Sequence, residues 1–115
     1  MLLVEKNIPK LNTTITYYVG QNALDNFEII DKSEDDDIWF HLENSSSSHI
    51  ICKMNDKYNK KDLKYIIVQG AVLCKQYSKK KSEKKVNIIY TRINNVIKTN
   101  ILGQVNLKDF KTITI

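Results

Sequence analysis

Residues 59–78 read NKKDLKYIIVQGAVLCKQYS and carry the strongest helical pattern in the chain. Apolar and small residues recur there every three or four positions, which is the spacing of one face of an α-helix. They are Leu63, Ile66, Ile67, Gly70, Leu73, Cys74 and Tyr77. Asn59 and Asp62 are placed to cap the first turn. Gly70 costs about 1 kcal/mol of helix propensity, so its place in this stripe indicates close approach to a sheet.

The segments on either side of this helix have the composition of β-strands. Strands are predicted over residues 13–19, 38–42, 49–54 and 86–92. A short helix is predicted over about residues 22–30, and residues 93–100 are expected to make a helical turn. Residues 103–107 and 111–115 look like a closing hairpin. This order predicts an α+β domain in which a long helix (about 60–78) and the short helix pack on a mainly antiparallel sheet.

The densest cluster of polar and aromatic residues falls on one predicted hairpin. If residues 38–42 and 49–54 pair symmetrically about residue 45, one face of the hairpin carries both histidines, the only tryptophan, an acid and a base. The pairs are His41 with His49, Trp39 with Ile51, and Asp37 with Lys53.

Three interpretations of this strip remain open. Trp39 stacks on a nucleobase while His41 and His49 donate or accept hydrogen bonds, or Trp39 is core and the histidines satisfy buried groups. The third is catalysis or metal binding, with Asp37 and His41, or a histidine and the serine run, as the candidate pair. Cys52 alternates to the face opposite His49 and the chain has no Cys-x-x-Cys spacing, so a zinc site is disfavoured.

The net charge of +5 is unevenly distributed along the chain. Residues 1–56 carry four Lys/Arg and ten Asp/Glu, whereas residues 57–115 carry fourteen and three. A basic domain with its cations in one half is typical of proteins that bind a polyanion. The alternative is a lysine-rich surface that keeps the protein in solution. The candidate phosphate-binding residues are Lys75, Lys79, Lys80, Lys81, Lys84, Lys85 and Lys98.

The 115 residues are enough for one domain, and 42% apolar with 27% charged residues is the balance of an ordinary globular protein. The longest apolar stretch, residues 65–74, is too short to span a bilayer. Two cysteines in a chain of this size are expected to be buried, reduced thiols. We therefore expect a single cytoplasmic domain over residues 1–115, with no cofactor and no membrane partner.

Several short motifs, in order, resemble the NFACT-R domain family, a predicted RNA-binding module. Asp37-Ile38-Trp39-Phe40-His41 is similar to the family's signature. Gly20, Asn22 and Asn26 look like its Gly-x-Asn-x-x-x-Asn segment, and Ser47-Ser48-His49-Ile50 resembles its Ser-x-His strand. Residues 71–78, 86–91 and 103–105 follow in the order the family shows, so the resemblance covers about residues 15–115. It extends to small coiled-coil-domain-containing relatives built around this domain.

The resemblance implies an RNA-binding module of the kind carried by ribosome-associated quality-control factors, with tRNA, ribosomal RNA or the ribosome as partner. We therefore expect a non-enzymatic domain whose lysines hold phosphates and whose Trp39, His41 and His49 shape or line the surface. Gly20, Asn22, Asn26 and Asp37 are expected to order the local structure. The alternatives are a protein-interaction adaptor that docks through its sheet, a DNA-binding domain, and an enzyme acting on nucleic acid.

Overall fold

The main sheet joins strands from both ends of the chain. The computed structural model describes residues 1–115 as two α-helices, two 3-10 turns and eight strands. Six strands lie in the order β1 (Leu2–Ile8), β2 (Thr13–Val19), β4 (Ile50–Cys52), β3 (Ile38–Leu42), β5 (Asn87–Arg92) and β8 (Lys111–Thr114). Every neighbouring pair is antiparallel. Two helices with a mostly antiparallel sheet confirm the predicted α+β class. The radius of gyration, 13.1 Å, is that of a compact chain of this length.

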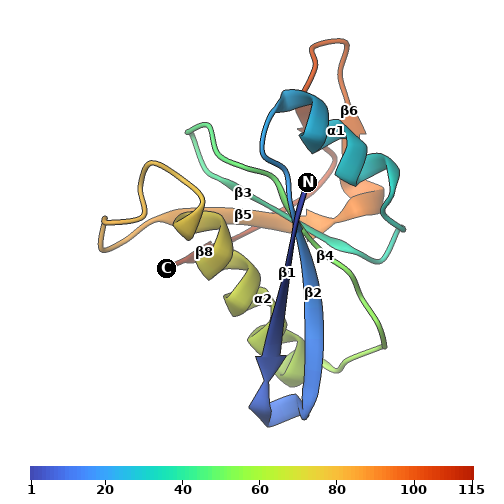
Figure 1. The fold of residues 1–115 in the computed structure, drawn as a ribbon, viewed down its shortest axis with the longest axis vertical. Helices are drawn as coiled ribbons and strands as arrows, with labels where there is room; N and C mark the ends of the chain where they lie inside the picture. Colours follow the sequence, from blue (N-terminus) through green and yellow to red (C-terminus); the bar gives the residue numbers. More distant parts are fainter.

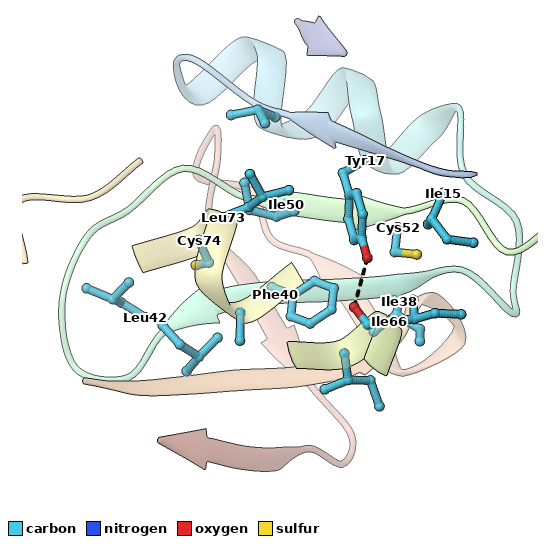
Figure 2. Packing of buried hydrophobic residues seen from close by; sticks show 14 of the residues in the cluster. Ile15, Tyr17, Ile38, Phe40, Leu42, Ile50, Cys52, Ile66, Leu73 and Cys74 are labelled. Carbon is cyan, nitrogen blue, oxygen red and sulfur yellow. Dashed lines mark hydrogen bonds between the residues drawn. The ribbon is translucent and has the colours of Figure 1, made fainter. Parts of the chain in front are cut away.

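Helix α2 (Lys60–Gln76) covers one face of the sheet (Figure 1). The Asn59 side chain caps it by accepting a hydrogen bond from the Asp62 backbone N–H at 2.8 Å. The apolar stripe of the helix packs on the inward side chains of β2, β3, β4 and β5. Figure 2 shows Phe40 in this layer and the Tyr17 hydroxyl, which donates to the Ile66 carbonyl at 2.8 Å. Neither α-helix is long and apolar enough to cross a membrane.

Helix α1 (Ala23–Asp31) lies on the other face of the sheet, beside a small second sheet of β6 (Val96–Lys98) and β7 (Val105–Leu107) (Figure 1). Ile29 and Ile30 of α1 pack on Trp39 and Ile51, together with Ile93. The central strands are therefore covered on both faces, because odd and even positions of β3 face different layers.

The structure corrects the predicted end of the chain. Residues 103–107 and 111–115 do not form a hairpin, because β7 pairs with β6 and β8 pairs with β5. The predicted helical turn is limited to Ile93–Asn95, after which the β-branched Val96 and Ile97 continue as a strand. Strand β1 was not predicted. It forms the edge of the sheet by pairing with β2 along its whole length.

Gly70 is the point of closest approach between α2 and the sheet. A Cβ atom built there would lie 2.2, 2.4 and 2.7 Å from three ring atoms of Phe40. Phe40 is completely buried, so its ring has no space into which it can retreat. The expectation that Gly70 permits close helix–sheet packing is confirmed.

Gly70→Ala is expected to destabilise the fold. Alanine gains about 1 kcal/mol of helix propensity, but overpacking a filled core costs about 1–3 kcal/mol, and the buried Phe40 ring makes the upper part of that range apply. Urea unfolding should show a net loss of about 1–2 kcal/mol. Gln76→Ala, at an exposed position of the same helix, serves as the control and should change stability by less than about 0.5 kcal/mol. A Gly70→Ala protein more stable than the wild type would contradict this packing.

Candidate nucleic-acid interface

Trp39, His41 and His49 meet on the α1 face of the sheet, as the symmetric hairpin register predicts. Trp39 is the cross-strand partner of Ile51. The Trp39 and His41 rings are parallel with centroids 5.6 Å apart, and the His49 ring stands edge-on to both at 5.2 Å. The predicted register and the predicted cluster are both confirmed.

Burial distinguishes the three rings. Trp39 is 2% exposed and His49 is 3% exposed, whereas His41 is half-buried. Ile29 and Ile30 of α1, together with Ile93, cover the indole. The interpretation of Trp39 as a stacking surface for a base is therefore corrected: the indole is core, because α1 occupies the space that a base would need. Its role is to shape the surface that His41 and His49 line.

The hydrogen bonds fix which nitrogen of each imidazole carries the proton. The Trp39 indole N–H, which can only donate, lies 3.1 Å from Nδ1 of His49, so the proton of His49 is on Nε2. The Leu42 carbonyl, which can only accept, lies 2.7 Å from Nδ1 of His41, so the proton of His41 is on Nδ1. Burial, helped by the nearby His41, lowers the pKa of His49 to about 3, and burial also lowers the pKa of His41. Both rings are therefore neutral at pH 7.

The turn between β2 and α1 is tied to His49. Asn22 caps α1 by accepting from the Asp25 backbone N–H at 2.8 Å. Asn26 accepts the His49 backbone N–H at 3.2 Å, and the Gly20 N–H donates to the His49 carbonyl at 2.9 Å. A Cβ atom on Gly20 would lie 2.0 Å from the Asn26 side-chain oxygen. These contacts join Gly20, Asn22 and Asn26 to one another and to His49 within this turn.

Asp37 lies at the other end of β3 from His41 and acts in the local structure. Its carboxylate accepts from the Lys53 amine at 2.7 Å, and from the backbone N–H groups of Met54 and Glu34, both at 2.9 Å. All of these partners lie where the acidic segment enters the sheet. Four residues of strand, about 13 Å, separate Asp37 from His41. The two side chains therefore do not form an acid–base pair.

The serine loop (residues 43–48) is ordered by its own hydrogen bonds. The Ser47 hydroxyl accepts from the Leu42 backbone N–H and donates to the Ser48 carbonyl, both at 3.1 Å. It also lies 3.8 Å from the Cys74 sulfur, whose pKa burial raises to about 12. No histidine bonds the Ser47 hydroxyl. The Ser47 hydroxyl therefore orders the loop and is not paired with the base that an attacking hydroxyl requires.

A cleft of about 1150 Å³ brings the sequence motifs together. Four segments far apart in the chain form its walls. They are the β2–α1 turn with Gly20, Asn22 and Asn26, the serine loop, the β6–β7 hairpin, and the start of the lysine loop (residues 79–85). Trp39, His41 and His49 also line it, and so do Lys79 and Lys81. The Gly-x-Asn segment, the Asp-x-Trp-Phe-His signature and the Ser-x-His strand thus share one concave surface.

The antiparallel topology separates the lysine loop from the acidic segment at residues 31–37. Strand β5 begins beside the end of β3, where Ile88 pairs with Leu42, and ends where Arg92 pairs with Ile38. The lysine loop precedes β5 and the acidic segment precedes β3, so they lie at opposite ends of these strands, about 15 Å apart. Most of the positive field of the lysine loop is therefore not cancelled by these acids, because that distance exceeds a Debye length at physiological salt.

Two of the remaining predicted phosphate ligands, Lys75 and Lys98, have partners within the chain. The Lys75 amine donates to the Ile115 backbone oxygen at 3.2 Å. Lys98 forms an ion pair with Asp31 and lies 5.4 Å from the centre of the Phe27 ring. Lys80 is half-buried, whereas Lys84 and Lys85 are exposed in the lysine loop, and none of the three lines the cleft. The structure thus groups the five loop lysines and sets Lys75 and Lys98 apart.

Other wall residues of the cleft were not predicted as site residues from the sequence. Leu102, Val105 and Leu107 reach it from the β6–β7 hairpin, and Ile89 reaches it from β5. The hairpin stays beside α1 because Gly103, at φ 84°, packs on Ala23, where a Cβ would lie 2.8 Å from the Ala23 Cβ. Only the pairing of β6 with β7, which the pattern of residues 93–107 does not reveal, brings these apolar side chains to the cleft.

The arrangement of motifs agrees with a family match. Residues 9–109 match the model of the NFACT protein RNA binding domain. The chain belongs to this family. Because it is a family of RNA-binding domains, not of enzymes, the match supports a role in binding nucleic acid and RNA in particular.

Relatives of known name cover nearly the whole chain. It is 30% identical over 111 residues to coiled-coil domain-containing protein 25 of Mus musculus, an alignment that covers 90% of this chain and 53% of the relative. The Bos taurus protein of the same name is 29% identical with the same coverage. The chain thus spans about half the length of these relatives. The C-terminal part of the fibronectin/fibrinogen-binding protein from Streptococcus suis has the same fold (TM-score 0.77, 22% identity, 88% of this chain and 40% of that chain).

The stability of the NFACT domain should fall as the pH falls below 6.5, because of His49. Its pKa of about 3 in the folded state lies below the ordinary value of 6.5, so only the unfolded chain takes up a proton between these values. The contribution of His49 to the free energy of unfolding is fully present well above pH 6.5. It should decrease by about 2 kcal/mol between pH 7 and pH 5. Urea unfolding at pH 7, 6 and 5 measures it.

The control is His49→Asn, whose amide oxygen can accept from Trp39 in place of Nδ1 but does not titrate in this range. Comparison at each pH removes the contribution of the carboxylates common to both proteins. The variant is expected to show a shallower pH dependence than the wild type. Equal slopes in the two proteins would contradict a buried, neutral His49.

Proposed function

We propose that this NFACT domain binds RNA at the end of the sheet formed by the cleft and the lysine loop. The observation that carries the proposal is that the family motifs and the loop lysines, far apart in the sequence, lie together around one cleft. Lys79 and Lys81 line the cleft, and Lys80, Lys84 and Lys85 extend the cationic surface beyond it. Phosphate neutralisation supplies most of the affinity of such a surface.

We further propose that the RNA is tRNA or ribosomal RNA and that the domain acts on the ribosome, in the cytoplasm. The support is the resemblance of its motifs to the domain carried by ribosome-associated quality-control factors. Sedimentation of the protein with ribosomes at low and moderate salt tests this context. The ribosomal context is supported if the protein comigrates with the large subunit and the change of the five loop lysines to Gln abolishes this comigration. Binding to free RNA without any ribosome association would overturn the context while leaving RNA binding intact.

One observation favours a protein partner as the second candidate function. Ile101 and Leu102, at the tip of the β6–β7 hairpin, are 54% and 52% exposed. The adaptor hypothesis in which a partner docks on the sheet is disfavoured, because helices and the second sheet cover its central strands. A protein partner would use the hairpin tip instead. Ile101→Ser, at a tip residue that does not line the cleft, should then weaken partner binding without changing the affinity for RNA.

Removing the five lysines of the lysine loop should nearly abolish RNA binding at physiological salt. The variant changes Lys79, Lys80, Lys81, Lys84 and Lys85 to Gln. If all five contact phosphates on a single strand, log affinity falls with log salt concentration at a slope of about −3.5 in the wild type. The variant is expected to show a slope near zero. Fluorescence anisotropy with a labelled RNA across a salt series measures both slopes.

A matched control removes the same charge elsewhere. Lys57 precedes α2, and Lys60, Lys61 and Lys64 lie in its first turns, about 18–24 Å of helix before its end at the lysine-loop side. Lys10 lies near them over the Tyr65 ring. Changing these five to Gln should leave most of the affinity and most of the slope. Equal losses in the two variants would indicate a response to net charge alone and would overturn the proposed surface.

A further inference from the structure

The two imidazoles in the cleft present a hydrogen-bond donor beside an acceptor. The bonds to Trp39 and Leu42 use Nδ1 of each ring, so Nε2 of His49 carries a proton and Nε2 of His41 carries a lone pair. Neither Nε2 has a partner within the chain. Every fully buried polar side-chain atom in the structure does have a partner. Both Nε2 atoms must therefore reach solvent, and both residues line the cleft.

The tautomers cannot change without a cost. If His49 moved its proton to Nδ1, two donors would face each other in the buried Trp39–His49 bond. Protonation of either ring is opposed by burial, which lowers both pKa values. The edge-on contact between the rings, 5.2 Å between centroids, keeps donor and acceptor on adjacent side chains. The cleft thus offers a fixed, uncharged donor–acceptor pair.

Apolar and cationic groups surround this pair. Leu102, Val105 and Leu107 form an apolar wall from the β6–β7 hairpin, and Ile89 adds to it from β5. Lys79 and Lys81 line the same cleft at the lysine loop. A nucleotide has matching chemistry, because its base has an apolar face and an edge that carries donors and acceptors, and its phosphate is anionic. The volume of about 1150 Å³ exceeds what one nucleotide requires.

We propose that the cleft binds one unpaired nucleotide of the RNA, whose base edge bonds His41 and His49 and whose phosphate lies at Lys79 and Lys81. This inference rests on the proposed RNA binding and specifies its ligand. The base must be unpaired, because pairing in a duplex occupies the edge that the two rings would contact. The lysine loop alone would hold a duplex and a single strand by their phosphates, so preference for the single strand is the property that the cleft adds.

The first test observes the histidines directly. Two-dimensional NMR of the imidazole groups is recorded during titration with AMP, CMP, GMP and UMP, one at a time. The ring signals of both His41 and His49 are expected to move with at least one nucleotide and to remain those of neutral imidazole. Rings unmoved by all four nucleotides, in a protein that binds a twelve-nucleotide single-stranded RNA, would overturn the cleft as a base site and leave RNA binding standing.

The second test removes the acceptor and keeps the ring. His41→Phe preserves the contact with Trp39 but has no nitrogen, and His41→Gln restores an acceptor near the position of Nε2. Affinity for single-stranded RNA is expected to fall roughly three- to tenfold in His41→Phe, the effect of one hydrogen bond, with recovery in His41→Gln. The salt slope should not change in either variant. Melting temperatures show that both variants are folded.

A duplex of the same sequence separates the two proposals. The wild type should bind the single strand more tightly than the duplex, and His41→Phe should reduce that difference. Equal binding of single strand and duplex by the wild type, unaffected by His41→Phe, would overturn the nucleotide site and retain the lysine loop as an RNA-binding surface. No binding of either RNA at low salt would instead overturn the proposed function itself.

Discussion

The hydrogen bond from the Trp39 indole to Nδ1 of His49 is the contact on which the site depends. It joins β3 to the start of β4, and the backbone of His49 is in turn bound by Gly20 and Asn26 of the β2–α1 turn. One buried residue thus connects three segments of the chain. Loss of the imidazole acceptor would leave a buried N–H unpaired, at a cost of about 1–3 kcal/mol. The floor of the cleft is therefore held by buried hydrogen bonds that are costly to break.

The same strands separate the core from the site. Alternation along β3 sends Ile38 and Phe40 toward α2 and sends Trp39 and His41 toward α1. The antiparallel order of β3 and β5 also places the acidic segment at one end of the sheet and the lysine loop at the other. A chain with a net charge of only +5 can therefore present a strongly cationic end. The sequence gathers the lysines in one loop, and the topology keeps the acidic segment away from them.

Local patterns predicted what local interactions determine. The stripe in residues 59–78, the cap Asn59, and the register of the β3–β4 hairpin follow from spacing within one or two elements, and all are present. The partners of β7 and β8 depend on contacts over long sequence separations, which a pattern does not contain. Strand β1 carries Lys6 among its inward positions, which interrupts the alternation that marks a strand. For the same reason the cluster of Trp39, His41 and His49 was predictable, whereas the apolar wall of the cleft was not.

The site therefore combines two kinds of surface with different physical behaviour. Exposed lysines in a loop act through a long-range field that added salt screens, and they contact any phosphate chain alike. The two neutral imidazoles act only at hydrogen-bond distance and depend weakly on salt, because neither carries a charge. Phosphate contacts position a nucleic acid and base contacts select it. In the proposed binding mode, selectivity accordingly arises in the cleft, since the cationic loop supplies attraction without the geometry needed to distinguish one nucleotide from another.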